Sequence, residues 1–327
     1  MRRLVKQFTA QLSEALEIGE KANLKPSKNQ INNIVITGLG GSGIGGKIAT
    51  QIVADQLKIP AVINNDYTMP KFINENTLVI VSSFSGNTEE TLEALKVAQE
   101  ANSEIACITH GGKLAEIAKE NDYNLLILPK AFSPRAMLTY SVIQQLYLFN
   151  HYGFVNNDYV EQTKATVALL DKEVEDIIST AKQTARALQN KTFVTYSESS
   201  MEGVIVRFKQ QINENSKALG WAHVFPEMNH NELVGWAGGK EEYAVIIFRS
   251  SYEHPRSSFR IDICKDIFKK HTSTVLEFNA KGDSFLAQTF YHILLGDWIS
   301  VYLAELYKVD DVEVEVINFL KAELAKI

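Results

Sequence analysis

A short apolar segment that runs into hydroxyl residues and glycine restricts the possible folds of this chain more than any other feature. Residues 78–81 read Leu-Val-Ile-Val, which is typical of a buried strand, and residues 82–88 read Ser-Ser-Phe-Ser-Gly-Asn-Thr before a helical pattern begins. The N–H groups and the positive dipole end at a helix start bind anions. The segment therefore predicts a strand, a phosphate-binding turn and a helix, in that order.

Strand and helix patterns alternate through the first half of the chain. Strands are predicted at 34–37, 60–64, 78–82, 105–109 and 125–128, and helices at 3–23, 46–57, 89–101 and 135–152. Short glycine-rich turns join them. This rhythm is typical of a mostly parallel sheet that is covered by helices on both faces, and the ligands of such sheets bind beyond the carboxyl ends of the strands.

The second half repeats this plan more loosely after a polar connector at 153–158. A helix is predicted up to residue 188, then strands at 193–196, 243–248 and 274–278 and helices at 202–218, 255–270 and 284–307. A last amphipathic helix contains Val312, Val316, Phe319, Leu320 and Leu324. We therefore expect two α/β domains, at residues 1–153 and 154–327.

Composition excludes several classes of protein. The 327 residues are 45% hydrophobic and 22% charged, as in globular proteins, and the net charge of −6 argues against nucleic acid as the main partner. Apolar runs are too short to span a membrane, and no apolar signal segment follows the first residues. The two cysteines, Cys107 and Cys264, have no metal-binding spacing. We expect a cytoplasmic protein.

Two alternative interpretations of the glycine and serine turns stay open at this point. Residues 38–43 match the pattern Gly-x-Gly-x-x-Gly, and Asp66 lies 66 − 43 = 23 residues further on, as in dinucleotide-binding proteins. A separate serine-rich turn at 82–88 weakens that interpretation, because one dinucleotide does not need it. Alternatively, Ser85 or Asn87 simply caps the following helix, with Glu90 completing a capping box.

Several motifs resemble a known family. Residues 40–43 (Gly-Gly-Ser-Gly) and 83–91 (Ser-Phe-Ser-Gly-Asn-Thr-Glu-Glu-Thr) resemble a sugar isomerase (SIS) domain. Residues 133–136, 213–217 and 226–232, the last reading Pro-Glu-Met-Asn-His-Asn-Glu, resemble the bifunctional phosphoglucose/phosphomannose isomerase family. The resemblance implies two SIS domains, a homodimer, and isomerisation of glucose 6-phosphate, and of mannose 6-phosphate, to fructose 6-phosphate without a metal or cofactor.

An aldose–ketose isomerase must open a sugar ring, move a proton between C1 and C2, and stabilise an enediolate, which requires acid/base groups and a cation. The resemblance assigns Glu214 as the proton-transferring base and His230 as the ring-opening acid/base, which serves the neighbouring subunit. It also assigns Arg135 to the enediolate charge and Lys321 to ring opening. His223 lies between apolar residues and is interpreted as structural.

The phosphate is expected to bind at the two turns, through Gly41, Ser42, Ser83, Ser85 and Thr88. Three positions depart from the family pattern. Phe84 stands where tyrosine is frequent, Met228 where tryptophan is frequent, and Val312 where a threonine is linked to the room around the C2 end of the sugar. We expect Val312 to affect the mannose 6-phosphate reaction more than the glucose 6-phosphate reaction.

A function of another class uses the same domain. A non-catalytic sugar-phosphate sensor needs the phosphate turn but not Glu214, His230 and Lys321 together. Such a sensor usually carries a DNA-binding or partner domain, and the sequence has no evident helix-turn-helix segment with a basic face.

Overall fold

The computed structural model describes residues 1–324 and 326, which form two compact units. The N-terminal unit comprises residues 6–172 and 282–290, and the C-terminal unit comprises residues 1–5, 173–281 and those from 291 onward. The division falls inside two long helices, α7 (Asp158–Leu188) and α11 (Phe285–Tyr307). The domain boundary between residues 153 and 154 stays a prediction.

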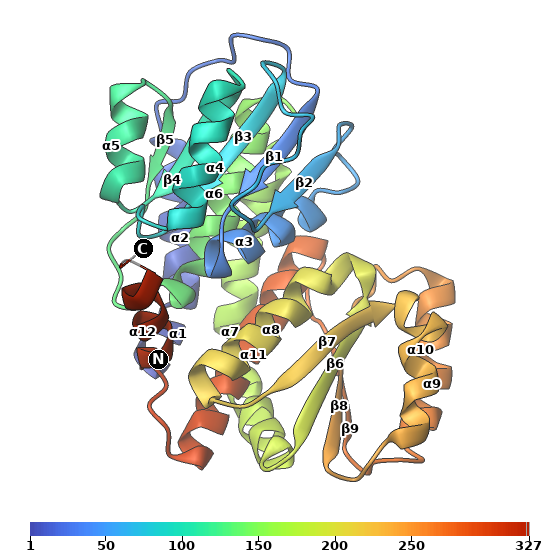
Figure 1. Cartoon of the computed structure of the whole chain (residues 1–327). Helices are drawn as coiled ribbons and strands as arrows, with labels where there is room; N and C mark the ends of the chain where they lie inside the picture. The colour runs from blue at the N-terminus through green and yellow to red at the C-terminus, as the bar shows by residue number, and fades with distance from the viewer. Residues whose placement is uncertain (325, 327) are drawn as a thin grey trace. The chain divides into compact units, whose positions relative to one another are not determined.

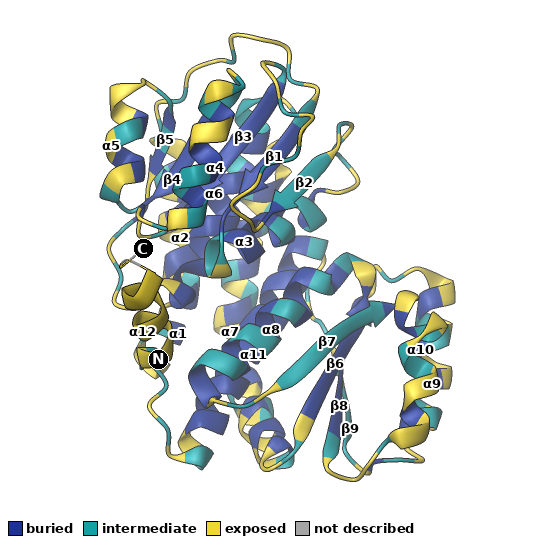
Figure 2. Ribbon diagram, in the orientation of Figure 1, coloured by how far each residue is buried: buried dark blue, intermediate teal, exposed yellow. Residues whose placement is uncertain are grey.

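A parallel sheet of five strands, in the order β2-β1-β3-β4-β5, forms the centre of the N-terminal unit (Figure 1). The strands are β1 (Asn33–Thr37), β2 (Ala61–Asn64), β3 (Thr77–Ser82), β4 (Glu104–Thr109) and β5 (Asn124–Ile127). The central strand β3 is buried along its whole length, as Figure 2 shows. Burial on both faces explains why its sequence is a continuous apolar run.

Helices cover both faces of this sheet. On one face, Val79 and Val81 of β3 pack in a core with Leu95 of α4 (Glu89–Glu100) and Leu114 of α5 (Gly112–Glu120). On the other face, Ile36 lies against Gly46 of α3. The helices of that layer, which pack against one another, are α2 (Phe8–Glu20), α3 (Gly40–Ile52) and α6 (Leu138–His151). The predicted doubly covered parallel sheet is confirmed.

The C-terminal unit has a second parallel sheet, in the order β7-β6-β8-β9. Its strands are β6 (Thr192–Glu198), β7 (Gly220–Phe225), β8 (Tyr243–Arg249) and β9 (Val275–Asn279). Tyr196 and Ile247 pack on one face with Phe268 of α10 (Pro255–Phe268). On the other face, Phe208 of α8 (Glu202–Ser216) contacts the rings of Phe193 and Phe248.

The observed strands and helices differ from the sequence-based predictions in several places. All eight predicted strands are present within two residues of the expected bounds, but β7 was not predicted. The helix predicted at 3–23 is two helices, α1 (Arg2–Val5) and α2, and the one predicted at 135–152 begins as a 3₁₀ turn, η1 (Pro134–Met137). The C-terminal helix α12 (Glu315–Leu324) begins after Val312, and its apolar side chains Val316, Phe319 and Leu320 are exposed.

The length and hydropathy of the described helices show whether any of them could span a membrane. None of the helices within residues 1–324 and 326 is both long enough and apolar enough to cross a bilayer.

His292 is a buried histidine in the part of α11 that belongs to the C-terminal unit. Its Nε2 atom lies 2.8 Å from the backbone oxygen of Arg249, and its ring packs edge-on against Phe248 with ring centroids 4.9 Å apart. Burial lowers the pKa of His292 from 6.5 to about 4, because the apolar surroundings disfavour the charged imidazolium.

We predict that His292 makes the C-terminal unit less stable in acid. Between pH 6.5 and 4 the unfolded chain binds a proton at this residue and the folded chain does not, so stability falls as pH falls. The contribution is roughly 2 kcal/mol between pH 7 and pH 5. His292→Gln, which keeps a donor for the Arg249 carbonyl, should reduce the difference between the melting temperatures at pH 7 and pH 5. The control His151→Gln, at a partly exposed histidine, should not. An unchanged difference in His292→Gln would contradict the assignment.

Candidate active site

The turn between β3 and α4 is held together by hydrogen bonds among its own hydroxyl and backbone groups. Thr88 is the N-cap residue of α4, and its Oγ1 lies 2.9 Å from Ser83 Oγ. The Gly86 N–H donates to the backbone oxygen of Ser83 at 3.1 Å and to its Oγ at 3.2 Å. Because Thr88 occupies the cap, the alternative in which Ser85 or Asn87 caps the helix is wrong. The hydroxyls organise the turn instead.

Gly86 permits this tight turn. Its φ is +70°, which side chains rarely tolerate, and a Cβ atom there would lie 1.8 Å from the backbone oxygen of Gly111. Its carbonyl accepts a hydrogen bond from the Leu114 N–H at 3.0 Å, so the turn also packs on the loop that precedes α5. Only glycine fits at this position.

The second glycine loop, residues 38–43, follows β1 and runs into the first turn of α3, because α3 begins at Gly40 and not at residue 46 as predicted. It lies beside the turn between β3 and α4. β1 and β3 are neighbours in the sheet, with Thr37 paired to Val81, so both loops leave the same edge. The Phe84 N–H donates to Ser42 Oγ at 3.2 Å. A Cβ atom on Gly41 would lie 3.9 Å from Cα of Arg135. The structure thus brings together the predicted residues Gly41, Ser42, Ser83, Thr88 and Arg135.

Ser85 and Phe84 differ in exposure within this turn. Ser85 is exposed, and its Oγ accepts a hydrogen bond from the Asn87 N–H at 3.2 Å. Phe84 is partly buried against the His110 ring, with ring centroids 5.0 Å apart. An aromatic ring at this position therefore supports the turn by packing.

Glu214 lies near the end of α8 in the C-terminal unit, where the helix is held by its neighbours in sequence. Asn215 Nδ2 donates to Ser300 Oγ at 2.9 Å, and Ser216 Oγ donates to the Ser300 carbonyl at 2.7 Å. Asn215 and Ser216 are both buried. These contacts fix the orientation of the last turn of α8. Asn215 and Ser216 face the protein interior there, and Glu214 lies on the partly exposed side of the helix.

A groove runs between this end of α8 and the C-terminal segment. Its volume is about 410 Å³, and its lining includes Glu214, Lys217, Leu219, Glu313 and Ile317. Lys217 has φ +56°, and its Nζ donates to the carbonyl oxygens of Glu214, Asp310 and Glu313 at 2.7–2.9 Å. Sequence reasoning missed this role of Lys217, which ties the segment containing Val312 to the helix containing Glu214.

Lys321 and His230 lie in different surroundings. Lys321 is exposed on α12, one turn after Ile317, which lines the groove, so the two residues lie on the same helix face. His230 is exposed at the end of a 3₁₀ turn, η3 (Glu227–His230), which follows β7. No metal-binding group of three or more His, Cys, Asp or Glu side chains occurs within residues 1–324 and 326.

Glu214 and His230 lie at opposite ends of β7. α8 leads into the first residue of the strand, and η3 follows its last residue (Figure 1). A strand of this length spans about 16 Å. The structure therefore does not bring these two predicted catalytic residues together within one C-terminal unit.

Comparisons with known proteins agree with this architecture. Residues 29–152 match the SIS domain family, and residues 177–324 match the family described as the bacterial phospho-glucose isomerase C-terminal SIS domain. A bifunctional phosphoglucose/phosphomannose isomerase of Caldicellulosiruptor bescii is 39% identical, over 97% of this chain and 96% of its own. One from Aquifex aeolicus is 35% identical, over 90% of each.

Similarity of fold extends to solved structures. The C-terminal domain of glucosamine-fructose-6-phosphate aminotransferase from Francisella tularensis superposes with a TM-score of 0.76. The match covers 96% of this chain and 98% of that one at 16% sequence identity, so it supports the fold alone.

We predict that Gly86→Ala weakens anion binding by at least about tenfold, which corresponds to roughly 1.4 kcal/mol. The added methyl group cannot occupy the space filled by the Gly111 carbonyl, so the turn must open. Titration with inorganic phosphate, followed by calorimetry, measures the effect. Gly235→Ala is a matched control, because a Cβ atom there meets open space. Equal phosphate affinity of wild type and Gly86→Ala would show that the turn is not the anion site.

Proposed function

Because the chain belongs to the bifunctional phosphoglucose/phosphomannose isomerase family, we propose that it interconverts glucose 6-phosphate and mannose 6-phosphate with fructose 6-phosphate. The structural observation that carries the proposal is the hydroxyl-lined turn between β3 and α4, with the second glycine loop hydrogen-bonded to it. Such a turn suits the phosphate group that these three sugars share.

The phosphate is bound in the N-terminal unit by neutral donors. The hydroxyls of Ser42, Ser83, Ser85 and Thr88 and the backbone at Gly41 supply hydrogen bonds, each worth about 1.5–3 kcal/mol with a charged partner. The phosphate group is the same in the aldose and the ketose, so these hydrogen bonds can be kept throughout the reaction. They hold the substrate, while other residues carry out the proton transfer.

Glu214 is the base in this proposal. Its carboxylate removes the proton from C2 of the open-chain aldose, and the electron pair moves toward the C1 carbonyl oxygen, which forms an enediolate. Return of the proton to C1, together with transfer of the O2 hydroxyl proton to O1, gives the ketose. Arg135, buried beside Gly41 of the second glycine loop, is the cation that stabilises the enediolate charge.

His230 and Lys321 open the sugar ring by transferring protons to and from the ring oxygen and the anomeric hydroxyl. Glu214 and His230 lie at opposite ends of β7, so one C-terminal unit does not present both to one sugar. This separation supports a homodimer in which His230 serves the active site of the neighbouring subunit.

Two other functions have less support. A sugar-phosphate sensor would use the turn, but it has no need of Glu214, His230 and Lys321 in addition. An NAD-dependent oxidoreductase would use the loop at 38–43 with Asp66, but Ser42 of that loop already accepts a hydrogen bond from the phosphate turn. Family membership favours the isomerase over both alternatives.

A coupled assay of fructose 6-phosphate formation, with EDTA present, tests the proposal directly. We expect turnover of both glucose 6-phosphate and mannose 6-phosphate. Turnover of glucose 6-phosphate alone would assign a specificity change to the segment around Val312. Absence of turnover with both sugars would reject the isomerase proposal and favour the sensor.

We predict that Glu214→Gln lowers kcat by about 10²–10⁴-fold, because the amide cannot accept the C2 proton. Inorganic phosphate should bind to this variant as it does to wild type, since the phosphate turn lies in the other unit. Glu202→Gln, at the first position of the same helix, is the control and should keep wild-type kcat. Near-full turnover by Glu214→Gln would rule out Glu214 as the base.

A further inference from the structure

Glu232 connects the segment that carries His230 to the sheet of the C-terminal unit. This segment, which we call the His230 loop, comprises residues 226–238 and contains η3, α9 (Glu232–Gly235) and η4 (Trp236–Gly238). Glu232 follows His230 by two residues. Because His230 itself is exposed, its position depends on how firmly the residues on either side are held.

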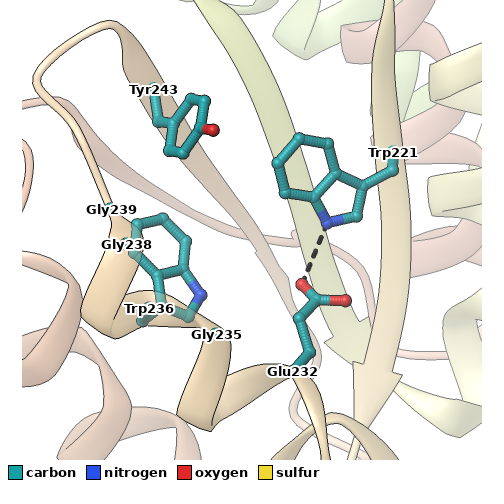
Figure 3. Close-up of a pocket in the computed structure, with 7 residues that line it drawn as sticks. All are labelled: Trp221, Glu232, Gly235, Trp236, Gly238, Gly239 and Tyr243. Atoms are coloured by element: carbon teal, nitrogen blue, oxygen red, sulfur yellow. Dashed lines mark hydrogen bonds between the residues drawn. The ribbon is translucent and has the colours of Figure 1, made fainter.

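The carboxylate of Glu232 accepts three hydrogen bonds from the sheet. Trp221 Nε1 donates to its Oε1 at 3.0 Å, the Tyr196 hydroxyl donates to the same oxygen, and His223 Nδ1 lies 2.9 Å from its Oε2. Figure 3 shows the contact with Trp221 at the side of a small pocket that Trp236 and Tyr243 also line. Since a carboxylate only accepts, the proton of His223 lies on Nδ1.

The network continues to the far end of the loop. The Tyr196 hydroxyl, in the buried strand β6, accepts a hydrogen bond from Trp236 Nε1 at 3.0 Å. Burial and the hydrogen bond to Glu232 raise the pKa of Tyr196, so its hydroxyl stays protonated and donates. Trp236 is itself 4% exposed and packs against Phe268. The loop is thus attached to the core at two points after His230.

Other contacts hold the loop before His230. The Met228 side chain is fully buried in the core cluster of the C-terminal unit. Asn229 Nδ2 donates to Sγ of Cys264 on α10 at 3.2 Å. His230 therefore lies between a segment fixed to α10 and a segment fixed to β6 and β7, although its own side chain is open to solvent.

We propose that Glu232 is a positioning residue for the isomerase reaction, which fixes the His230 loop so that His230 is presented in one place. This inference rests on the proposed function of His230 in ring opening. A misplacement of about 1 Å can cost a catalytic group a hundredfold in rate, so an exposed acid/base residue needs an anchor of this kind. Glu232 acts through His230 and does not touch the sugar.

The test is a double-variant cycle of Glu232→Ala and His230→Ala. We expect Glu232→Ala alone to lower kcat by at least about tenfold with little change in KM, and to lower it less than about twofold when His230 is already alanine. Equal losses in both backgrounds would overturn the proposal, since a merely structural residue affects both alike. Glu232→Gln, which keeps an acceptor for Tyr196 and Trp221, should lose less and provides a variant that folds.

Glu227→Gln is the matched control. Glu227 lies in the same loop, is exposed, and bonds to the Asn231 amide at 2.9 Å, which a glutamine oxygen can also accept. We expect this variant to keep wild-type kcat. A loss equal to that of Glu232→Gln would overturn the specific role of Glu232.

Amide hydrogen exchange of residues 226–238 provides a readout that needs no turnover. Exchange should be faster in Glu232→Ala than in wild type and unchanged in Glu227→Gln. Unchanged exchange in Glu232→Ala would overturn the anchoring. Faster exchange in a protein without isomerase activity on the hexose phosphates would support the anchor and reject the proposed function, so the two failures are distinguishable.

Discussion

The parallel direction of the strands is the constraint on which the arrangement of functional residues depends. In a parallel sheet every strand ends at the same edge, and every connecting helix returns to the opposite edge. In the N-terminal unit this rule places the ends of β1 and β3 side by side, so that Ser42 and the Phe84 N–H meet. In the C-terminal unit the same rule separates Glu214, at the end of a returning helix, from His230, beyond the end of a strand.

Burial decides which strands a sequence pattern reveals. β3 is covered on both faces and is therefore an uninterrupted apolar run, which any periodicity argument detects. β7 is an edge strand whose first five residues are only partly buried, and it contains Gly220 and His223. The side chain of His223 forms a hydrogen bond with Glu232, which lies outside the strand. β7 therefore shows neither a continuous apolar run nor a regular alternation of apolar and polar residues. For this reason the sequence pattern does not predict it.

Local sequence supplies the candidate site residues, but it does not supply the contacts between them. Ser83, Gly86 and Thr88 lie within one turn, and local sequence is enough to expect a phosphate loop there. The contact between Ser42 and Phe84 joins residues 42 positions apart and requires the register of the sheet. The role of Lys217 requires carbonyl groups from Asp310 and Glu313, almost a hundred residues further on. The periodic spacing of apolar residues along the sequence does not predict contacts between residues so far apart.

The distribution of charge explains how an acidic chain can bind and transform a sugar phosphate. With a net charge of −6, the chain as a whole does not attract anions, so the proposed phosphate turn would rely on short-range donors that are already in place. The catalytic step instead requires groups that change their charge, and these must be held without being buried, since burial would disfavour the charged form. Lys217 and Glu232 act in the same way. Each forms the hydrogen bonds that hold a segment in place, and the neighbouring residue that we propose as an acid/base group stays exposed or partly exposed. Glu214 and His230, the proposed acid/base residues, are thus accessible to a substrate while their neighbours in the sequence are held by hydrogen bonds.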